Sequence, residues 1–170
     1  MTEQLRKDLS DFELQRISGG ELRSRLPFPM ENKSKELRKI MDEVIAFKKG
    51  EDVAQALTLL WLLEENHEFT DLLHQLILES WHTRYEEIIH SLQERKDPSS
   101  VPVIREAIQK KYEYLESYGT GTAQFISQCG HALKSIGTPE ALEVIKDLAE
   151  HSNDPLVKAA MRYRWEKINA

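Results

Sequence analysis

Three pairs of an acidic residue and a histidine recur between residues 71 and 90, with a spacing that places both side chains on one face of a helix. They are Asp71 and His74, Glu79 and His82, and Glu87 and His90. A carboxylate beside an imidazole on a helix is typical of iron sites in helical bundles, but those sites take their ligands from several helices. On one helix that rises about 1.5 Å per residue, successive histidines would lie about 12 Å apart. We therefore expect that these residues do not form a metal site and that the protein has no metal cofactor.

The usual patterns of a catalytic or cofactor-binding site are also missing from the sequence. The single cysteine, Cys129, stands in an expected helix without the neighbours of a catalytic thiol. The stretch 119–122, Gly-Thr-Gly-Thr, lacks the spacing of a phosphate-binding loop and is better explained as a loop that enters a helix. We therefore expect a protein that is not an enzyme, with no catalytic residues and no cofactor.

The negative charge of the chain is concentrated in its middle. Residues 51–95 contain ten Asp and Glu against two Lys and Arg, whereas residues 1–50 contain nine against eleven and residues 96–170 ten against ten. An acidic surface repels phosphate backbones and attracts a basic protein surface. We expect a protein partner with a basic surface and no nucleic-acid partner. The alternative is that the acidity only keeps the protein soluble.

Composition and hydropathy favour a protein without membrane segments. The longest apolar run, residues 54–63, is interrupted by Gln55 and Thr58, and it is far shorter than the roughly 20 residues that span a bilayer. The first residues alternate charged and apolar types and lack the apolar core of a secretion signal. We expect a cytoplasmic protein that does not associate with membranes.

Apolar periodicity, together with the positions of Gly and Pro, predicts an all-α fold. A first helix is expected over residues 2–17, ended by Gly19-Gly20, and a loop over residues 19–31. A second helix is expected from about Asn32 to the residues before Gly50. Residues 1–50 are therefore predicted to form an N-terminal helical cap or arm.

From residue 51 onward the pattern predicts pairs of helices that repeat. Apolar positions coincide when Ala54, Pro98 and Pro139 are superposed, at intervals of 44 and 41 residues. Such a period is that of HEAT or armadillo repeats. Residues 51–170 are predicted to be helical repeats that form one compact unit with the cap. The expected helices span residues 52–65, 69–95, 99–117, 122–135, 139–151 and 155–168.

Short motifs mark the last two helix pairs. They are Ala132-Leu133-Lys134-Ser135-Ile136-Gly137, Thr138-Pro139-Glu140-Ala141 and Asp154-Pro155-Leu156-Val157-Lys158-Ala159-Ala160. With these motifs the chain resembles the HEAT repeats of the phycobilisome-lyase type, best over residues 122–169 and more weakly over 51–121. The resemblance implies a right-handed α-α superhelix of HEAT-like helix pairs with an N-terminal helical extension. The chain departs from the pattern at Lys158, usually Arg, and at Arg164, where the repeats carry a small residue.

The acidic helix expected over residues 69–95 is the predicted contact surface. Trp81 and Tyr85 are four residues apart, and an aromatic pair within a polar rim is how interfaces concentrate binding energy. Packing between helices is the alternative for this pair, and Trp61 and Trp165, which lie in apolar stripes, are expected in the core. The predicted partner-binding residues are Glu64, Glu65, Glu68, Asp71, Glu79, Trp81, Tyr85, Glu86 and Glu87.

These features predict a non-catalytic protein-binding module that presents an acidic helical groove to a basic partner protein. Small acidic proteins of this kind resemble bacterial toxin-immunity proteins, which block a basic toxin by covering its active surface. One alternative is a general HEAT-repeat adaptor with a structural or regulatory role, in which acidity serves solubility alone. A helical metal-dependent enzyme that uses the carboxylates and histidines of residues 69–95 is a less favoured alternative.

Overall fold

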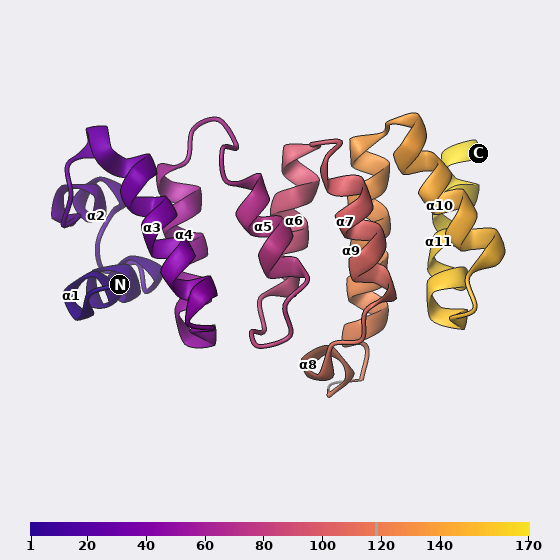
Figure 1. Cartoon of the computed structure of the whole chain (residues 1–170), viewed down its shortest axis with the longest axis horizontal. Helices are drawn as coiled ribbons and strands as arrows, with labels where there is room; N and C mark the ends of the chain where they lie inside the picture. Colours follow the sequence, from indigo (N-terminus) through magenta and orange to yellow (C-terminus); the bar gives the residue numbers. More distant parts are fainter. Residues whose placement is uncertain (118) are drawn as a thin grey trace. The chain divides into compact units, whose positions relative to one another are not determined.

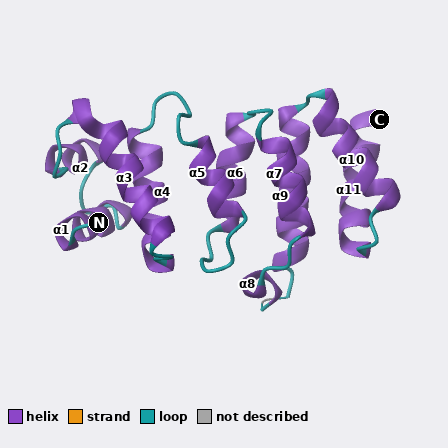
Figure 2. Cartoon of the chain, viewed as in Figure 1, coloured by secondary structure: helices purple, strands orange, loops and turns teal. Residues whose placement is uncertain are grey.

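The chain is built from α-helices joined by loops (Figures 1 and 2). The structure, a computed structural model, describes residues 1–117 and 119–170. Within these residues there are eleven α-helices and no β-strand, which confirms the predicted all-helical class. No helix in this part of the chain has both the length and the apolar character needed to cross a membrane. The helices are α1 (Glu3–Glu13), α2 (Gly19–Arg25), α3 (Lys33–Ala46), α4 (Val53–Leu63), α5 (Thr70–Ile77), α6 (Tyr85–Arg95), α7 (Ser100–Gln109), α8 (Glu113–Glu116), α9 (Gly121–Ile136), α10 (Pro139–His151) and α11 (Pro155–Asn169).

Two compact units make up the chain, Met1–Leu72 and Leu73–Ala170, and the division falls within α5. In the first unit, α1 and α3 both pack against α4. Arg6 on α1 donates two hydrogen bonds to the carboxylate of the buried Asp52, at 2.8 and 2.7 Å. These bonds fasten α1 to the turn from which α4 begins. Residues 1–50 are therefore packed onto α4.

The loop predicted over residues 19–31 is wrong in its first part, because Gly19–Arg25 forms α2. The Ser18 hydroxyl accepts a hydrogen bond from the backbone N–H of Glu21 at 3.2 Å, and the Glu21 carboxylate accepts one from the backbone N–H of Ser18 at 2.7 Å. This reciprocal capping box satisfies two N–H groups at the start of the helix. The two glycines therefore begin α2, and α1 already ends at Glu13.

In the second unit, α9 packs against α6 and α11, and α10 packs against α11 and α9 (Figure 1). The helix starts predicted from proline are confirmed, since α10 begins at Pro139 and α11 at Pro155. The preceding residues, Thr138 and Asp154, accept hydrogen bonds from backbone N–H groups of the first turn. Proline fits the first position of a helix because its missing N–H would have no partner there.

The long helix predicted over residues 69–95 is wrong, because the chain forms α5 and α6 with a loop at residues 78–84 between them (Figure 2). The helix predicted over residues 99–117 is likewise divided into α7 and α8. The prediction that Trp61 lies in the core is wrong, because its side chain is 49% exposed. Trp165 is half-buried.

Candidate functional site

The acidic residues predicted between positions 64 and 71 have partners within the first unit, several of them on α3. Arg38 donates two hydrogen bonds to Asp71, at 2.9 and 3.2 Å, and its guanidinium lies 5.0 Å from the centre of the Phe69 ring. Lys33 forms an ion pair with Glu65. The hydrogen bonds from Arg38 hold the pKa of the Asp71 carboxyl below its usual 3.8, and Lys33 likewise lowers the pKa of Glu65. Both carboxylates are therefore held by basic residues of α3.

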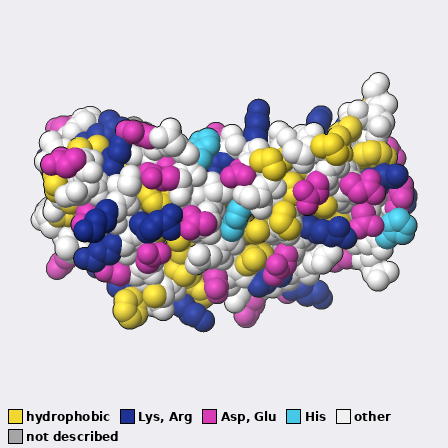
Figure 3. All heavy atoms as spheres, turned by 45° about the horizontal axis from the view of Figure 1, so that its top comes forward, with side chains coloured by type: hydrophobic (Ala, Val, Ile, Leu, Met, Phe, Trp, Pro, Cys, Tyr) yellow, Lys and Arg dark blue, Asp and Glu magenta, His cyan; other side chains and the backbone are white. Residues whose placement is uncertain are grey.

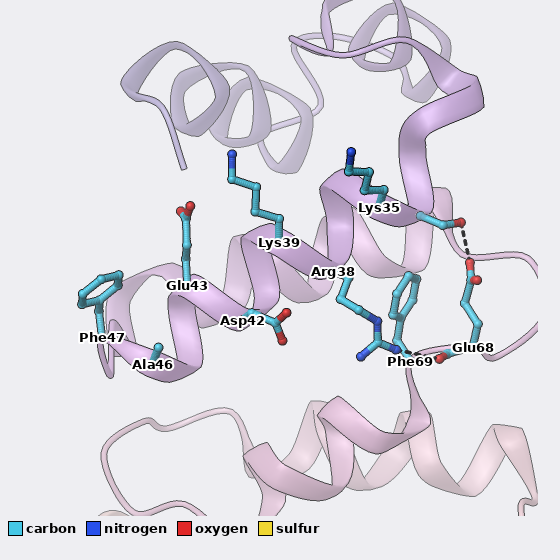
Figure 4. A pocket seen from close by; sticks show the side chains of 10 residues that line it. Lys35, Arg38, Lys39, Asp42, Glu43, Ala46, Phe47, Glu68 and Phe69 are labelled. Atoms are coloured by element: carbon cyan, nitrogen blue, oxygen red, sulfur yellow. Dashed lines mark hydrogen bonds between the residues drawn. The ribbon is translucent and has the colours of Figure 1, made fainter.

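The remaining two predicted acids of this stretch also accept hydrogen bonds within the fold. Glu64 accepts one from the backbone N–H of Phe69 at 3.0 Å, and Glu68 accepts one from the Ser34 hydroxyl at 2.7 Å (Figure 4). On the face of the N-terminal unit seen in Figure 3, acidic and basic side chains are interspersed. This stretch therefore does not present the open acidic surface that its sequence suggests.

A groove of about 590 Å³ follows the exposed side of α3 (Figure 4). Lys35, Lys39 and Glu43 project from one side of the helix, and the exposed ring of Phe47 stands at its C-terminal end. The groove is thus lined by charges of both signs. Arg38, which also lines the groove, is already bonded to Asp71.

In the second unit, the loop at residues 78–84 is held by side chains that bond to backbone carbonyls. The Tyr85 hydroxyl donates to the carbonyl of Glu79 at 3.0 Å, and the Tyr112 hydroxyl donates to the carbonyl of Ile77 at 2.7 Å. Carbonyl groups at the C-terminal end of a helix lack partners within it and need others. Tyr112 supplies such a partner to the last residue of α5, and Tyr85 holds the carbonyl of Glu79 in the loop that follows.

His82 completes this arrangement as a buried, neutral imidazole. Its Nε2 lies 2.7 Å from the carbonyl oxygen of Leu76, and its Nδ1 accepts a hydrogen bond from the backbone N–H of Arg84 at 3.0 Å. Both contacts are satisfied when the proton is on Nε2. Burial lowers the pKa of His82 below its usual 6.5, which favours this neutral form. His82 belongs to a buried aromatic cluster that also contains Tyr85, Tyr112 and Phe125.

Beside this cluster, the outer face of α6 borders a cavity of about 420 Å³, which we call the α6 pocket. Tyr114 is 40% exposed, and its ring lies 6.5 Å from the ring of Tyr85. Arg84 forms an ion pair with Glu87 at 3.0 Å. The pocket thus combines carboxylates with an exposed aromatic ring. Its lining residues are Thr83, Arg84, Glu86, Glu87, His90 and Tyr114.

The structure separates the two aromatic residues predicted as anchors. Tyr85 is 0% exposed, so its predicted contact with a partner is wrong and packing between helices explains it. Trp81 is half-buried, and its Nε1 donates a hydrogen bond to Glu79 at 2.8 Å. An exposed aromatic residue that does line the α6 pocket is Tyr114 of α8, which is not among the predicted site residues.

The histidines of the three acid–histidine pairs have other partners than the acid three residues before them. His74 bonds to the hydroxyl of Ser100 at 2.8 Å, His82 bonds to backbone groups, and His90 lies 3.5 Å from Glu94. In the part of the chain that the structure describes, no group of three or more His, Cys, Asp and Glu side chains is arranged to hold a metal ion. The arrangement therefore gives no support to the metal-dependent alternative.

No protein family, no curated protein and no solved structure matches this chain. The site is accordingly defined by its geometry. Among the predicted site residues, Glu86 and Glu87 line the α6 pocket, while Glu79 and Trp81 bond to each other in the adjoining loop.

Proposed function

We propose that the chain is a non-catalytic protein-binding module and that the α6 pocket receives a basic side chain of the partner protein. The observation that carries this proposal is one cavity that brings the carboxylates of Glu86 and Glu87 together with the exposed ring of Tyr114. A lysine or arginine side chain is attracted both to carboxylates and to the face of an aromatic ring. Of the acidic surface predicted from sequence, this proposal assigns only the outer face of α6 to partner binding.

The carboxylates of the α6 pocket can pair with an added cation. The carboxylate of Glu86 has no ion pair or hydrogen bond with any residue that the structure describes. Glu87 is paired with Arg84, but both side chains of that pair are partly exposed, and such surface pairs contribute little to stability. A partner's guanidinium or ammonium group would therefore displace Arg84 at a small cost.

We also propose that the helix pairs of the second unit are HEAT-like repeats that form a right-handed superhelix. The support comes from positions that align across the repeat and are buried alike. Ile104 and Ile145 are both fully buried, and so are Cys129 and Met161. Burial of the same positions against successive neighbours is the property of a helical repeat, and repeat proteins use extended surfaces to bind partners.

The test is charge reversal in the pocket, Glu86→Lys with Glu87→Lys, compared with Glu140→Lys and Glu143→Lys on the exposed side of α10. Both variants change the net charge equally. The probe is a short lysine- and arginine-rich peptide, titrated into isotope-labelled protein and followed by NMR. We expect shifts around residues 83–94 and an affinity loss of about tenfold or more, ~1.4 kcal/mol, in the pocket variant alone. Added salt should weaken the binding.

Tyr114→Ala tests the aromatic part of the pocket. We expect it to weaken binding of the same peptide by about 0.5–1 kcal/mol, the usual size of an exposed cation–π contact. Equal loss in the α10 variant, or shifts spread evenly over both units, would mean that the peptide responds only to general acidity, and the proposal would be rejected.

A further inference from the structure

The contact between α9 and α11 contains a positive charge that lacks a negative partner. Arg164 on α11 is only 6% exposed. Its Nε is buried without a hydrogen-bond partner, and no carboxylate among the described residues pairs with it. An arginine stays protonated in proteins, and a buried charge without a counterion is strongly unfavourable. The contact is therefore electrostatically incomplete.

The residues of α9 near Arg164 do not offset its positive charge. A Cβ atom placed on Gly130 would lie 3.8 Å from the Arg164 Nε, so the guanidinium lies close to the backbone of α9. At the next residue, burial lowers the pKa of His131, and the positive charges of Arg164 and Lys134 lower it further. These neighbours therefore supply no negative charge to balance Arg164, and its guanidinium is complementary to an anion.

A second buried polar atom, on α9, also lacks a hydrogen-bond partner. The described residues contain two buried side-chain polar atoms without a hydrogen bond, the Arg164 Nε and the Gln128 Oε1. Gln128 belongs to α9, the helix against which α11 packs. Buried polar groups in folded proteins are nearly always hydrogen-bonded. Of these two atoms, the Arg164 Nε lies at the α9–α11 contact, and its unused N–H indicates that a polar ligand completes this contact.

We propose that Arg164 binds an acidic side chain of a partner protein, which enters at the α9–α11 contact. A carboxylate suits the guanidinium because its two oxygens can accept two parallel N–H bonds. A protein ligand is favoured over a free anion because the neighbouring residue on α11, Tyr163, is an aromatic side chain that is 57% exposed. Exposed aromatic and apolar side chains beside a charged group are typical of protein interfaces. This inference goes beyond the α6 pocket and does not depend on it.

The test compares Arg164→Met, which keeps the length of the side chain and removes its charge, with Arg162→Met, an exposed arginine on the same helix. The Nε–H resonance of Arg164 is followed by NMR during titration with two peptides that differ only in Glu against Gln. We expect a saturable shift with the glutamate peptide and none with the glutamine peptide. Arg164→Met should weaken binding of the glutamate peptide by about tenfold, whereas Arg162→Met should leave it unchanged.

Two further measurements keep the result interpretable. Because Arg164→Met removes an unpaired buried charge, the thermal midpoint of this variant should equal or exceed that of the unchanged protein. If Arg164→Met does not fold, Arg164→Lys is tested in its place. Lysine keeps the charge but cannot form two parallel N–H bonds, so this variant should also bind the glutamate peptide more weakly. The absence of a saturable shift, or an equal loss in Arg162→Met, would overturn the proposal. Sodium acetate or inorganic phosphate bound as tightly as the glutamate peptide would overturn it too, because the site would then be one for free anions.

Discussion

The acidic residues at positions 64–71 and those at positions 86 and 87 belong to one acidic stretch of sequence, but they have different neighbours in the fold. In the first unit, Asp71 is held by two hydrogen bonds from Arg38. In the second unit, Glu87 is paired only with the adjacent Arg84, and Glu86 lines the α6 pocket. The number of acidic residues in a stretch therefore does not measure the charge that is available to a partner. Availability depends on whether a basic face from elsewhere in the chain, here α3, packs against it.

The two regions also differ in what holds them in place. The segment at residues 64–71 is fastened to α3 by ion pairs and hydrogen bonds near the surface. The loop before α6 is instead fastened by the buried aromatic cluster, through the hydroxyls of Tyr85 and Tyr112. Surface pairs contribute little each, whereas a buried aromatic side chain contributes several kcal/mol. The same kind of sequence should therefore respond very differently to mutation in the two regions.

The largest effect is expected in the aromatic cluster. Tyr85→Ala should lower the free energy of unfolding by about 3–5 kcal/mol, the usual loss for a large buried aromatic side chain. Tyr114→Ala should lower it by less than about 1 kcal/mol, because its ring is partly exposed. Urea unfolding followed by circular dichroism measures both. If both variants lost a similar free energy of unfolding, the distinction between Tyr85, which supports the pocket from within the core, and Tyr114, which lines it at the surface, would be contradicted.

A smaller effect is expected where ion pairs hold the first region. Arg38→Met removes the bonds to Asp71 and the contact with Phe69, and should lower the free energy of unfolding by about 1 kcal/mol. A double-mutant cycle with Asp71→Asn should give a coupling energy of about 0.5–1 kcal/mol. Lys39→Met on the same helix is the matched control and should change stability by less than about 0.5 kcal/mol. A control that loses as much as Arg38→Met would show that the pair with Asp71 is not the cause.

Much of the fold was predictable because its signals are local. Proline at the first position of a helix and a capping side chain before it locate the starts of α10 and α11 within a few residues of sequence. The break between α5 and α6 was not predictable in this way. It depends on Tyr112, which lies 35 residues beyond the carbonyl that it bonds, and no proline or glycine marks the loop.

The candidate site shows the same limit. Glu86 and Glu87 were predicted as site residues from charge, and the structure does place them at a pocket. The pairing of Asp71 with Arg38, 33 residues earlier in the chain, could not be inferred from the charge of its own stretch. Tyr85 was expected to face a partner because it follows Trp81 by one helical turn, but those two residues do not share a helix. Spacing indicates a shared face only where the helix is continuous.

The smallest expected effect is on how stability changes with pH, and it distinguishes the two regions because each contributes in a different pH range. Burial lowers the pKa of His82 in the folded chain, with Glu79 and Glu87 opposing this more weakly. As the pH falls below about 6.5, the unfolded chain therefore binds this proton first and stability begins to fall.

For Asp71, hydrogen bonds from Arg38 lower the folded pKa below 3.8, so its contribution is present above about pH 4 and is lost as the pH falls through the folded pKa. When the free energy of unfolding is measured from about pH 7 to about pH 3, its decline should be smaller in the upper part of this range for His82→Gln and smaller in the lower part for Asp71→Asn. A residual decline below about pH 4 is expected in Asp71→Asn, because the pKa values of Asp52, Glu65 and Asp97 are also lowered in the folded chain. His131, whose pKa is also lowered by burial, remains in both variants, so a residual decline below about pH 6.5 is expected in His82→Gln. If both variants flattened the same part of the profile, the two regions would not be held by the separate contacts described above.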